Sequence, residues 1–333
     1  MATVGMGRKA RGRRATTTVA LLAASVTAAL AAGCTGSGGP ADDGRGRPSP
    51  PAPNQSPADP TSRAGSVLAV KIDNVRAALP QTGLNAADVV YAEQVEGGLS
   101  RLMAVYATQL PEVVGPVRSA RESDLELLRQ FEQPIFAFSG AHSKLLPLIN
   151  KAPLDAQTPG KVADAFFRDS DRASPHNLYL RPDKLLSSAP GEDALTTGFR
   201  YGAAPEGGQR ETSRTVRYPA ARFTFTWSAD QGSWLVSQDG TPTVTTDGQR
   251  VAPATVVVQH VKVRESAFRD FLGNNTPYTE TVGSGTAEVL RGGRAYDVRW
   301  EREKATDGTE FTTNDGAPVN FARGQVWVVF VKA

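Results

Sequence analysis

The stretch from Asp88 to Arg121 constrains the fold more than any other part of this 333-residue chain. It contains two runs of β-branched and aromatic residues, 89–95 and 102–106, with consecutive glycines between them. Such runs predict β-strands, and Gly97-Gly98 suits a two-residue hairpin loop in which both positions have positive φ. We therefore expect the chain to reverse direction here and to pair the two strands in antiparallel fashion.

The register of this hairpin decides which charged side chains share a face. With a two-glycine loop, Gln94 lies opposite Arg101, so Glu96 and Arg101 are diagonal neighbours on one face. Glu93 then points to the other face, which argues against a paired-carboxylate site formed by Glu93 and Glu96. The register predicts a Glu96–Arg101 ion pair, either as a brace for the turn or at the mouth of a pocket.

A helix is expected after the sequence Pro116-Val117-Arg118-Ser119-Ala120-Arg121, because apolar residues then recur at helical spacing until Pro134. Its N-terminus has two possible capping boxes, which begin at Ser119 or at Ser123. Either choice leaves backbone N–H groups beside Arg118 and Arg121, which are expected to be the freer charges of the region. Such a helix end is a natural site for phosphate, sulfate or carboxylate. The alternative is an ordinary capped helix with solvated arginines.

The first 33 residues indicate an export signal. They contain five basic residues and no acidic one, followed by an apolar run at 16–32. This run is shorter than the roughly 20 apolar residues that a membrane span needs. Leu30-Ala31-Ala32-Gly33-Cys34 resembles a bacterial lipobox, and Cys34 is the only cysteine of the chain, so we expect it to carry a lipid anchor. The alternative is an ordinary cleaved signal with an incidental cysteine, and the general secretory and twin-arginine export routes both stay open.

The net charge of +3 is a consequence of this signal. Once its five basic residues are removed, 32 basic residues remain against 34 acidic ones, which gives a net charge near −2. Nucleic-acid binding depends on a basic surface that neutralises phosphates, and the remaining part of the chain has no general basic excess. We therefore expect no nucleic-acid partner.

Composition divides the rest of the chain into three parts. Residues 34–65 hold seven prolines, six glycines and no large apolar residue, so this segment cannot bury a core and is expected to be a disordered tether. Residues 66–195 are expected to form a ligand-binding domain of the α/β (or α+β) class. Residues 196–333 contain many short strand-like runs separated by Asp-Gly and Gly-Gly turn signals, which predict a mainly-β domain.

The α/β expectation rests on strand ends that carry polar residues. An apolar run at 67–72 ends at Asp73-Asn74, and a second run at 135–138 leads into Ser139-Gly140-Ala141-His142 and a short helix. In α/β folds, ligands gather at such strand ends. Of the three histidines, His142 and His176 lie in polar segments of this kind, which favours a site over purely structural roles.

Several motifs spread between residues 66 and 333 point together to one known family. They are Asn74, Pro80-Gln81-Thr82-Gly83-Leu84, Ala87-Asp88, Glu96-Gly97-Gly98 with Arg101, Gly115-Pro116-Val117-Arg118-Ser119-Ala120-Arg121, Ser139-Gly140-Ala141-His142, Ser174-Pro175-His176-Asn177-Leu178-Tyr179, Val282-Gly283-Ser284-Gly285, Trp300 and Gly324-Gln325-Val326-Trp327. This set resembles the YerB-type bacterial envelope lipoproteins, which are built on a domain of unknown function. The resemblance implies a lipid-anchored, two-domain extracytoplasmic protein and brings no established reaction.

The function favoured by these features is binding of an anionic envelope ligand, such as a wall polymer or a phosphorylated glycan. Arginines would hold the anion, while amide and imidazole groups would read its shape. No cofactor and no metal are predicted. The candidate ligand-binding residues are Asn74, Glu96, Arg101, Arg118, Ser119, Arg121, His142, Arg168, Arg172, His176 and Asn177.

Two alternatives stay open. The first is a hydrolase or transferase acting on such a polymer, with Glu96 or His176 as acid/base and Ser119 or an activated water as nucleophile. No familiar catalytic motif supports it. A metal-dependent version would draw its ligands from Asp73, Glu93, Glu96, His142 and His176, whose spacing is not diagnostic. The second alternative is a protein–protein scaffold of the envelope, with the mainly-β domain as docking face and an unknown protein as partner.

Overall fold

The computed structural model describes residues 65–269 and 273–333. These residues all belong to one compact unit of the chain. The predicted signal peptide, the lipid anchor predicted at Cys34 and the predicted tether as far as residue 64 lie outside the described residues.

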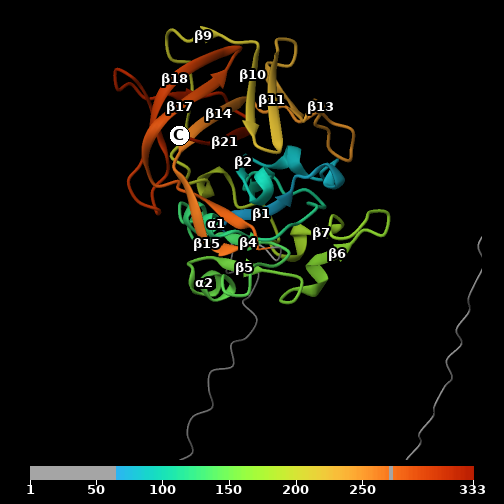
Figure 1. Ribbon diagram of the computed structural model, residues 1–333. Helices are drawn as coiled ribbons and strands as arrows, with labels where there is room; N and C mark the ends of the chain where they lie inside the picture. The colour runs from blue at the N-terminus through green and yellow to red at the C-terminus, as the bar shows by residue number, and fades with distance from the viewer. Residues whose placement is uncertain (1–64, 270–272) are drawn as a thin grey trace, which may run out of the picture. The chain divides into compact units, whose positions relative to one another are not determined.

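A long mixed β-sheet organises the described residues (Figure 1). It is 11-stranded, in the order β19-β18-β17-β14-β21-β2-β3-β1-β4-β5, with β9 paired to β18. Its strands are β1 (Leu68–Asp73), β2 (Val89–Gln94), β3 (Ser100–Tyr106), β4 (Ile135–Ala137), β5 (Asp155–Gln157), β9 (Gln209–Arg210), β14 (Thr255–Val261), β17 (Gly283–Arg291), β18 (Arg294–Arg302), β19 (Glu310–Thr313) and β21 (Val326–Lys332).

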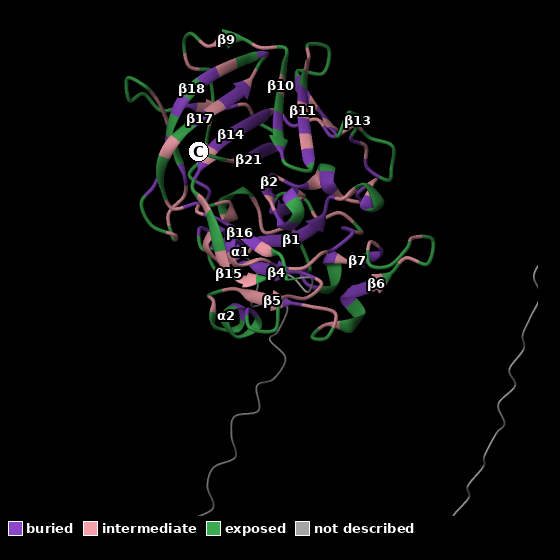
Figure 2. Cartoon of the chain, in the orientation of Figure 1, coloured by how far each residue is buried: buried purple, intermediate pink, exposed green. Residues whose placement is uncertain are grey.

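Both faces of the central strands are buried, which explains their nearly continuous apolar sequences (Figure 2). In β1, Leu68, Val70 and Ile72 pack into the hydrophobic core on one face, whereas Ala69 packs into the core on the other. A strand that alternates between two cores has no solvent face, so its sequence lacks the usual alternation of apolar and polar residues. Each large apolar side chain buried in this way contributes roughly 1.5–3 kcal/mol.

The long sheet is shared by the two halves of the sequence. The C-terminal strand β21 lies between β2 and β14 and is parallel to both, with Val326 opposite Val89 in β2 and Thr255 in β14. Figure 1 shows this junction between the strands of the N-terminal half and the orange-to-red strands of the C-terminal half. Residues 66–195 and 196–333 are therefore connected by strand pairing through the middle of one sheet.

The N-terminal half is less helical than the α/β prediction expects. The described residues contain two α-helices, α1 (Glu122–Leu128) and α2 (Leu146–Lys151), and both are short. β1 pairs in parallel with β4, and β4 pairs in parallel with β5. The predicted strand–turn–helix unit is present, because β4 is followed in the chain by a turn and then by α2. Most of the regular structure is nevertheless β, and an α/β class for this half is not clearly supported. The other helical turns are 3-10 helices at Arg76–Ala78, Leu84–Ala86, Glu96–Gly98, Ala163–Ala165, Pro182–Lys184 and Glu192–Ala194.

The C-terminal half is mainly β, as its turn signals predict. Besides its share of the long sheet it contains a four-stranded sheet and the β15–β16 hairpin, and Tyr278 of this hairpin donates a hydrogen bond to Glu126 of α1 (3.0 Å). The hairpin therefore lies against the N-terminal half. The other strands of the C-terminal half are β8 (Arg200–Tyr201), β10 (Ser213–Tyr218), β11 (Ala221–Ser228), β12 (Ser233–Gln238), β13 (Thr241–Pro242), β15 (Val263–Arg269), β16 (Asn275–Thr279) and β20 (Asn320–Phe321). The N-terminal half also contains β6 (Phe166–Arg168) and β7 (Leu178–Leu180).

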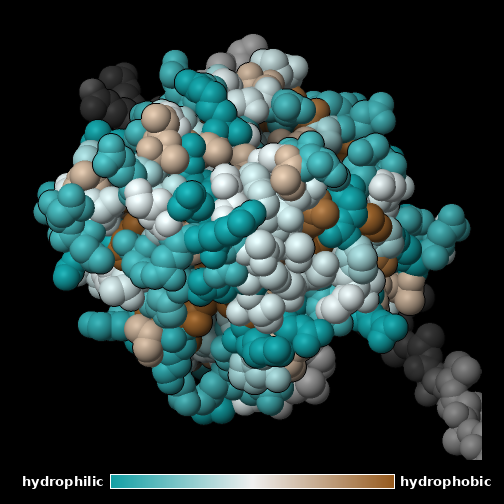
Figure 3. All heavy atoms as spheres, turned by 90° about the horizontal axis from the view of Figure 1, so that it is seen from above, coloured by the Kyte–Doolittle hydropathy of each residue, from teal (hydrophilic) through white to brown (hydrophobic). Residues whose placement is uncertain are grey.

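The face of the molecule in Figure 3 is mostly hydrophilic, with hydrophobic residues scattered in small groups. Leu146 and Leu148 of α2 are the large hydrophobic side chains that the described residues leave exposed. Across residues 65–269 and 273–333, none of the helices has the length and apolar character needed to cross a membrane.

Gly97 and Gly98 provide a matched test of the contact between the two halves. Both have positive φ, +67° and +71°, so alanine at either position costs roughly 1–2 kcal/mol in backbone strain. A Cβ at Gly98 would lie 2.5 Å from Pro219 Cβ, whereas nothing lies within 4 Å of one at Gly97. We expect Gly98→Ala to lower the free energy of unfolding by about 1–3 kcal/mol more than Gly97→Ala, in chemical denaturation. Equal losses would contradict the contact between this loop and Pro219.

Candidate functional site

The β2–β3 hairpin, which contains Glu93, Glu96 and Arg101, has a three-residue loop. Glu96–Gly98 form a 3-10 turn, and the Val95 N–H donates to the Leu99 carbonyl (2.8 Å). Glu93 therefore lies opposite Arg101, and the register predicted with a two-residue loop is wrong by one position. The error arises because Glu96 belongs to the turn and not to the strand. Glu93 consequently shares its face with Arg101.

Charged side chains gather at the polar end of one face of the sheet. In β1, Lys71 and Asp73 lie on the same face of the sheet as Ala69. Glu93 in β2 and Arg101 in β3 lie on this face too. The segment that leads into α1 adds further charges. We call this group the charged layer, and it comprises Lys71, Asp73, Glu93, Glu96, Arg101, Arg118, Arg121 and Asp124. Its four cations and four anions balance overall, but its parts do not balance separately.

Lys71 lies at the fully buried end of the charged layer, between two carboxylates. Its Nζ contacts Glu93 Oε1 and, at 2.6 Å, Asp124 Oδ1, while Ser123 Oγ donates to Glu93 Oε2 (2.8 Å). Burial lowers the pKa of Lys71, but Asp124 and Glu93 outweigh burial and raise it. Burial also raises the pKa of Asp124 to about 6, against the attraction of Lys71 and with the repulsion of Glu93. One cation thus serves two carboxylates here.

Asp124 makes the stability of the fold depend on pH in a defined direction. Its folded-state pKa of about 6 lies above the ordinary value of 3.8, so between these values the folded state binds more protons than the unfolded state. The resulting stabilisation is fully present below the ordinary pKa of 3.8 and is lost as the pH rises through the folded-state pKa of about 6.

In thermal unfolding, we therefore expect the Tm of the unaltered chain minus the Tm of Asp124→Asn to fall as the pH is raised from about 4 to about 7. Taking the difference removes the contribution of the other carboxylates, which titrate in both proteins. A difference that stays constant, or rises, across this range would show that Asp124 does not titrate as its surroundings require.

Asp73, at the end of β1, is the centre of the other part of the charged layer. It is fully buried, and its Oδ1 accepts from the Asn74 N–H (2.9 Å) and lies 3.3 Å from Arg101 NH1. Its Oδ2 lies 2.7 Å from His176 Nδ1 and 3.2 Å from Arg118 Nε. Because a carboxylate only accepts hydrogen bonds, His176 Nδ1 carries the proton of this contact. Two guanidinium groups and one imidazole thus converge on a single carboxylate.

Cations exceed anions around Arg101. Burial lowers the pKa of Arg101, and the nearby guanidinium groups of Arg121 and Arg118 lower it further, against the opposing effect of Asp73 and, to a smaller extent, of Glu96. Arg101 Nε is also buried without a hydrogen-bond partner. The region around Asp73 is therefore one where a further negative charge would be favourable.

Arg118 and His176 present unused polar groups at the surface of this region. Within the described part of the chain, Arg118 contacts Asp73 through Nε, and its two terminal nitrogens have no partner. His176 Nε2 likewise has no partner there. The side chains of Arg118 and His176 are 24% and 20% exposed, whereas that of Asp73 is buried. We call Asp73, Arg118 and His176 the Asp73 site.

Asn74 is buried next to Asp73. Its Nδ2 donates to Ser100 Oγ (2.8 Å), and its Oδ1 accepts from Gln81 Nε2 (2.9 Å). Its backbone carbonyl accepts from Gln238 Nε2 (2.5 Å). These bonds fix the end of β1 and connect it to the four-stranded sheet, to which Gln238 belongs. The predicted role of Asn74 as a ligand contact stays a prediction.

Arg172 and Asn177 hold the loop that carries His176. Arg172 donates to two carbonyl groups of the 78–80 segment (3.2 and 3.0 Å), and Asn177 Oδ1 accepts from Arg168 NH1 (2.7 Å). Arg168, Arg172 and Asn177 therefore position His176. Their predicted contact with a ligand stays a prediction.

Arg121 is paired with Glu96, which corrects two predictions. Its Nε lies 2.8 Å from Glu96 Oε1 and its NH2 2.8 Å from Oε2, and Thr276 Oγ1 donates to Oε1 (2.5 Å). Burial raises the pKa of Glu96, but Arg121 and Thr276 outweigh burial and lower it. The predicted Glu96–Arg101 pair is wrong, because Arg101 contacts Asp73 instead. The expectation that Arg121 is one of the freer charges is also wrong, because Arg121 is paired with Glu96.

The N-terminus of α1 is capped by its own residues, and the anion site predicted there stays a prediction. Arg121 is the N-cap residue, and Asp124 Oδ2 accepts from the Arg121 N–H (2.7 Å). The two capping boxes predicted from Ser119 and Ser123 are therefore wrong, and Ser123 donates to Glu93 instead. The carboxylate of Asp124 thus satisfies one of the backbone N–H groups that the predicted anion site would use.

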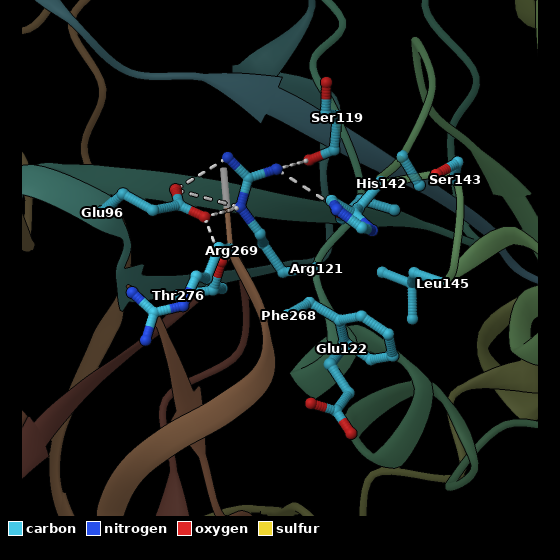
Figure 4. Close-up of a pocket in the computed structure, with 12 residues that line it drawn as sticks. Glu96, Ser119, Arg121, Glu122, His142, Ser143, Leu145, Phe268, Arg269 and Thr276 are labelled. Atoms are coloured by element: carbon cyan, nitrogen blue, oxygen red, sulfur yellow. Dashed lines mark hydrogen bonds and ion pairs between the residues drawn. The ribbon is translucent and has the colours of Figure 1, made fainter. Parts of the chain in front are cut away.

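A separate pocket of about 410 Å³ opens beside Arg121 (Figure 4). Figure 4 shows Glu96 and Thr276 on one side of Arg121, and His142 and Ser143 on the other. The candidate residues are thus divided between two places. Those that line this pocket are Glu96, Ser119, Arg121 and His142, whereas Asn74, Arg101, Arg118, Arg172, His176 and Asn177 do not line it.

The residues that organise the charged layer are not evident as site residues in the sequence. Asp73 enters the sequence argument as a polar residue at a strand end and as a possible metal ligand, and Asp124 does not enter it. One signal is present, since Lys71 interrupts the apolar run at 67–72 and a lysine in a buried strand requires anionic partners. Those partners lie at positions 93 and 124, which no local pattern connects to it.

The suggested metal ligands are dispersed. Among residues 65–269 and 273–333, no group of three or more His, Cys, Asp or Glu side chains is placed to hold a metal ion. Of the five ligands suggested from the sequence, Asp73 and His176 are in contact, while Glu93 and Glu96 belong to different ion pairs.

Comparison with known protein families accounts for most of the chain. Residues 54–195 match the family described as "Protein of unknown function (DUF3048) N-terminal domain", and residues 214–328 match the corresponding C-terminal domain. The chain belongs to the DUF3048 family. The resemblance drawn from the sequence motifs is thereby confirmed.

Two comparisons with individual proteins agree with this assignment. The chain is 24% identical over 281 residues to the Bacillus subtilis (strain 168) protein named "Putative lipoprotein YerB", covering 79% of this chain and 80% of the relative. The crystal structure of YerB from Bacillus subtilis superposes with a TM-score of 0.66 at 21% identity, covering 80% of this chain and 91% of that one. The two proteins therefore share a fold.

Proposed function

We propose that this DUF3048 protein is a lipid-anchored, extracytoplasmic protein that binds an anionic group of a cell-envelope polymer at the Asp73 site. The basic and apolar N-terminal segment that ends at Cys34 supports the anchor, and so does the relative's name as a lipoprotein. A wall polymer or a phosphorylated glycan is the ligand class that such a position makes available.

The observation that carries the proposal is the sharing of one buried carboxylate oxygen. Arg118 Nε and His176 Nδ1 both contact Asp73 Oδ2, so the terminal nitrogens of Arg118 and Nε2 of His176 are held in place without being used. A guanidinium group fixed in this way has lost its conformational freedom before the ligand arrives, which lowers the entropic cost of binding. Its remaining N–H donors suit the paired oxygens of a phosphate or carboxylate.

Binding of poly(glycerol phosphate) to the purified extracytoplasmic part tests this proposal. We expect Arg118→Gln to weaken binding by roughly tenfold or more, because a hydrogen bond to a charged group contributes about 1.5–3 kcal/mol. Arg214→Gln is the matched control, since Arg214 is 28% exposed and is also paired with carboxylates, but lies in the C-terminal half. Affinity that is unchanged in Arg118→Gln, or equally reduced in Arg214→Gln, would contradict binding at the Asp73 site.

A second candidate function, hydrolysis or transfer on such a polymer, is favoured by the contact between His176 and Asp73. A carboxylate that holds Nδ1 leaves Nε2 as the basic nitrogen, which is the arrangement of a general base oriented by an acid. Ser119 Oγ lies 3.3 Å from Ser139 Oγ, and no hydrogen bond joins it to His176 among the described residues, so this geometry favours a different nucleophile. An activated water would serve instead.

Release of products from the same polymer, followed by ³¹P NMR, separates the two functions. If the reaction occurs, we expect His176→Gln to abolish product release while weakening binding less than Arg118→Gln does. His142→Gln is the control, because His142 is exposed and lies in the other pocket. Equal rates in the unaltered chain and in His176→Gln would exclude His176 as the general base.

A further inference from the structure

The pocket beside Arg121 differs in character from the Asp73 site. Its walls come from the 119–122 and 141–145 segments of the N-terminal half, and from Phe268, Arg269 and Thr276 of the β15–β16 hairpin. Its volume of about 410 Å³ lies within the range of small-molecule sites, which is roughly 300–1,000 Å³. The two halves of the sequence therefore build this pocket together.

Charges in this pocket are balanced. Arg121 and Glu96 satisfy each other through two contacts of 2.8 Å, and Thr276 completes the shell of Glu96. The lining contains one further carboxylate and one further guanidinium group, which have separate partners. Glu122 accepts from Ser266 Oγ (2.5 Å), and Arg269 donates to a backbone carbonyl. With equal numbers of carboxylates and guanidinium groups, the pocket has no excess charge to attract an anion.

The rest of the lining combines aromatic faces with hydrogen-bonding groups. The rings of His142 and Phe268 lie 5.8 Å apart at an angle of 42°, next to the buried Leu145. His142 Nδ1 accepts from the Lys144 N–H (3.2 Å), so Nε2 is the nitrogen left to donate. The hydroxyl groups of Ser119 and Ser143 add further donors and acceptors.

These features match the chemistry of a neutral sugar. A pyranose ring has C–H faces that pack on aromatic rings and hydroxyl groups that both donate and accept hydrogen bonds, while carrying no charge. We propose that the pocket lined by Phe268, His142 and Ser119 is a binding site for a neutral sugar residue. The inference rests on the proposed function in taking the ligand to be an envelope glycan, but it uses a different set of side chains.

The chain segment between the two sites explains how one polymer could reach both. Arg118 directs its side chain to Asp73, while the next residue, Ser119, lines the pocket. A glycan that carries an anionic substituent near a neutral sugar would place the first beside Arg118 and His176 and the second beside Phe268. In this proposal, the two sites are neighbouring parts of one recognition surface.

The experiment uses the full chain after the signal, with three neutral tetrasaccharides as probes: those of glucose, mannose and N-acetylglucosamine. Saturation-transfer NMR and calorimetry measure binding, and poly(glycerol phosphate) is titrated in parallel. We expect at least one tetrasaccharide to bind and Phe268→Ala to weaken it at least tenfold. Phe268→Tyr keeps the ring, so we expect its affinity to stay within about threefold.

Ser143→Trp is a second variant that does not depend on the hairpin. Ser143 is exposed at the pocket wall, so a large side chain there fills the pocket without disturbing the core, and we expect it to abolish tetrasaccharide binding. Leu148→Ala, at an exposed position of α2 outside the pocket lining, is the neutral control. If no tetrasaccharide binds at millimolar concentration, or if Ser143→Trp binds as well as the unaltered chain, the sugar site is overturned.

The two proposals fail in different ways. Arg118→Gln should lose poly(glycerol phosphate) and keep the tetrasaccharide, whereas Ser143→Trp should do the reverse. Loss of the tetrasaccharide in Arg118→Gln together with its retention in Ser143→Trp would move the sugar to the Asp73 site and overturn the assignment of the pocket. Failure of poly(glycerol phosphate) alone to bind would count against the proposed function and leave the sugar site supported.

Discussion

Burial of charge at the end of the central strands is the constraint on which the rest of the structure depends. An ion removed from water costs several kcal/mol unless its partners meet it in good geometry. Lys71 and Asp73 are both fully buried in β1. Their partners come from β2, β3, the segment before α1, α1 itself and the loop at residue 176. These segments must therefore all be in place at once, which fixes the geometry of the Asp73 site.

The charged layer also explains which parts of the site could be predicted. The strands at 67–72, 89–95 and 102–106 follow from local composition, and so does the mainly-β C-terminal half. The pairing of Arg121 with Glu96 does not, because it depends on a loop longer by one residue than the glycine pair suggests. Likewise, the contact between Asp73 and His176 joins positions 103 residues apart, and only the folded chain brings them together.

The α/β expectation failed in part for a related reason. Polar residues at strand ends and a glycine turn before a helix are genuine features of β4 and α2, but they say little about helix length. In this fold both faces of the sheet near β1 are covered largely by strands, turns and short helices instead of long helices. The C-terminal half contributes to this cover, for example through the β15–β16 hairpin over α1. A reading that treats the halves separately cannot anticipate it.

The position of β21 has a consequence for how the chain reaches its folded state. This strand is last in sequence, yet it lies in the interior of the sheet, between β2 and β14. Until Val326–Lys332 has been made, β2 and β14 each expose an unpaired edge and part of two apolar faces. Synthesis from the N-terminus therefore leaves the long sheet incomplete until Lys332 has been made.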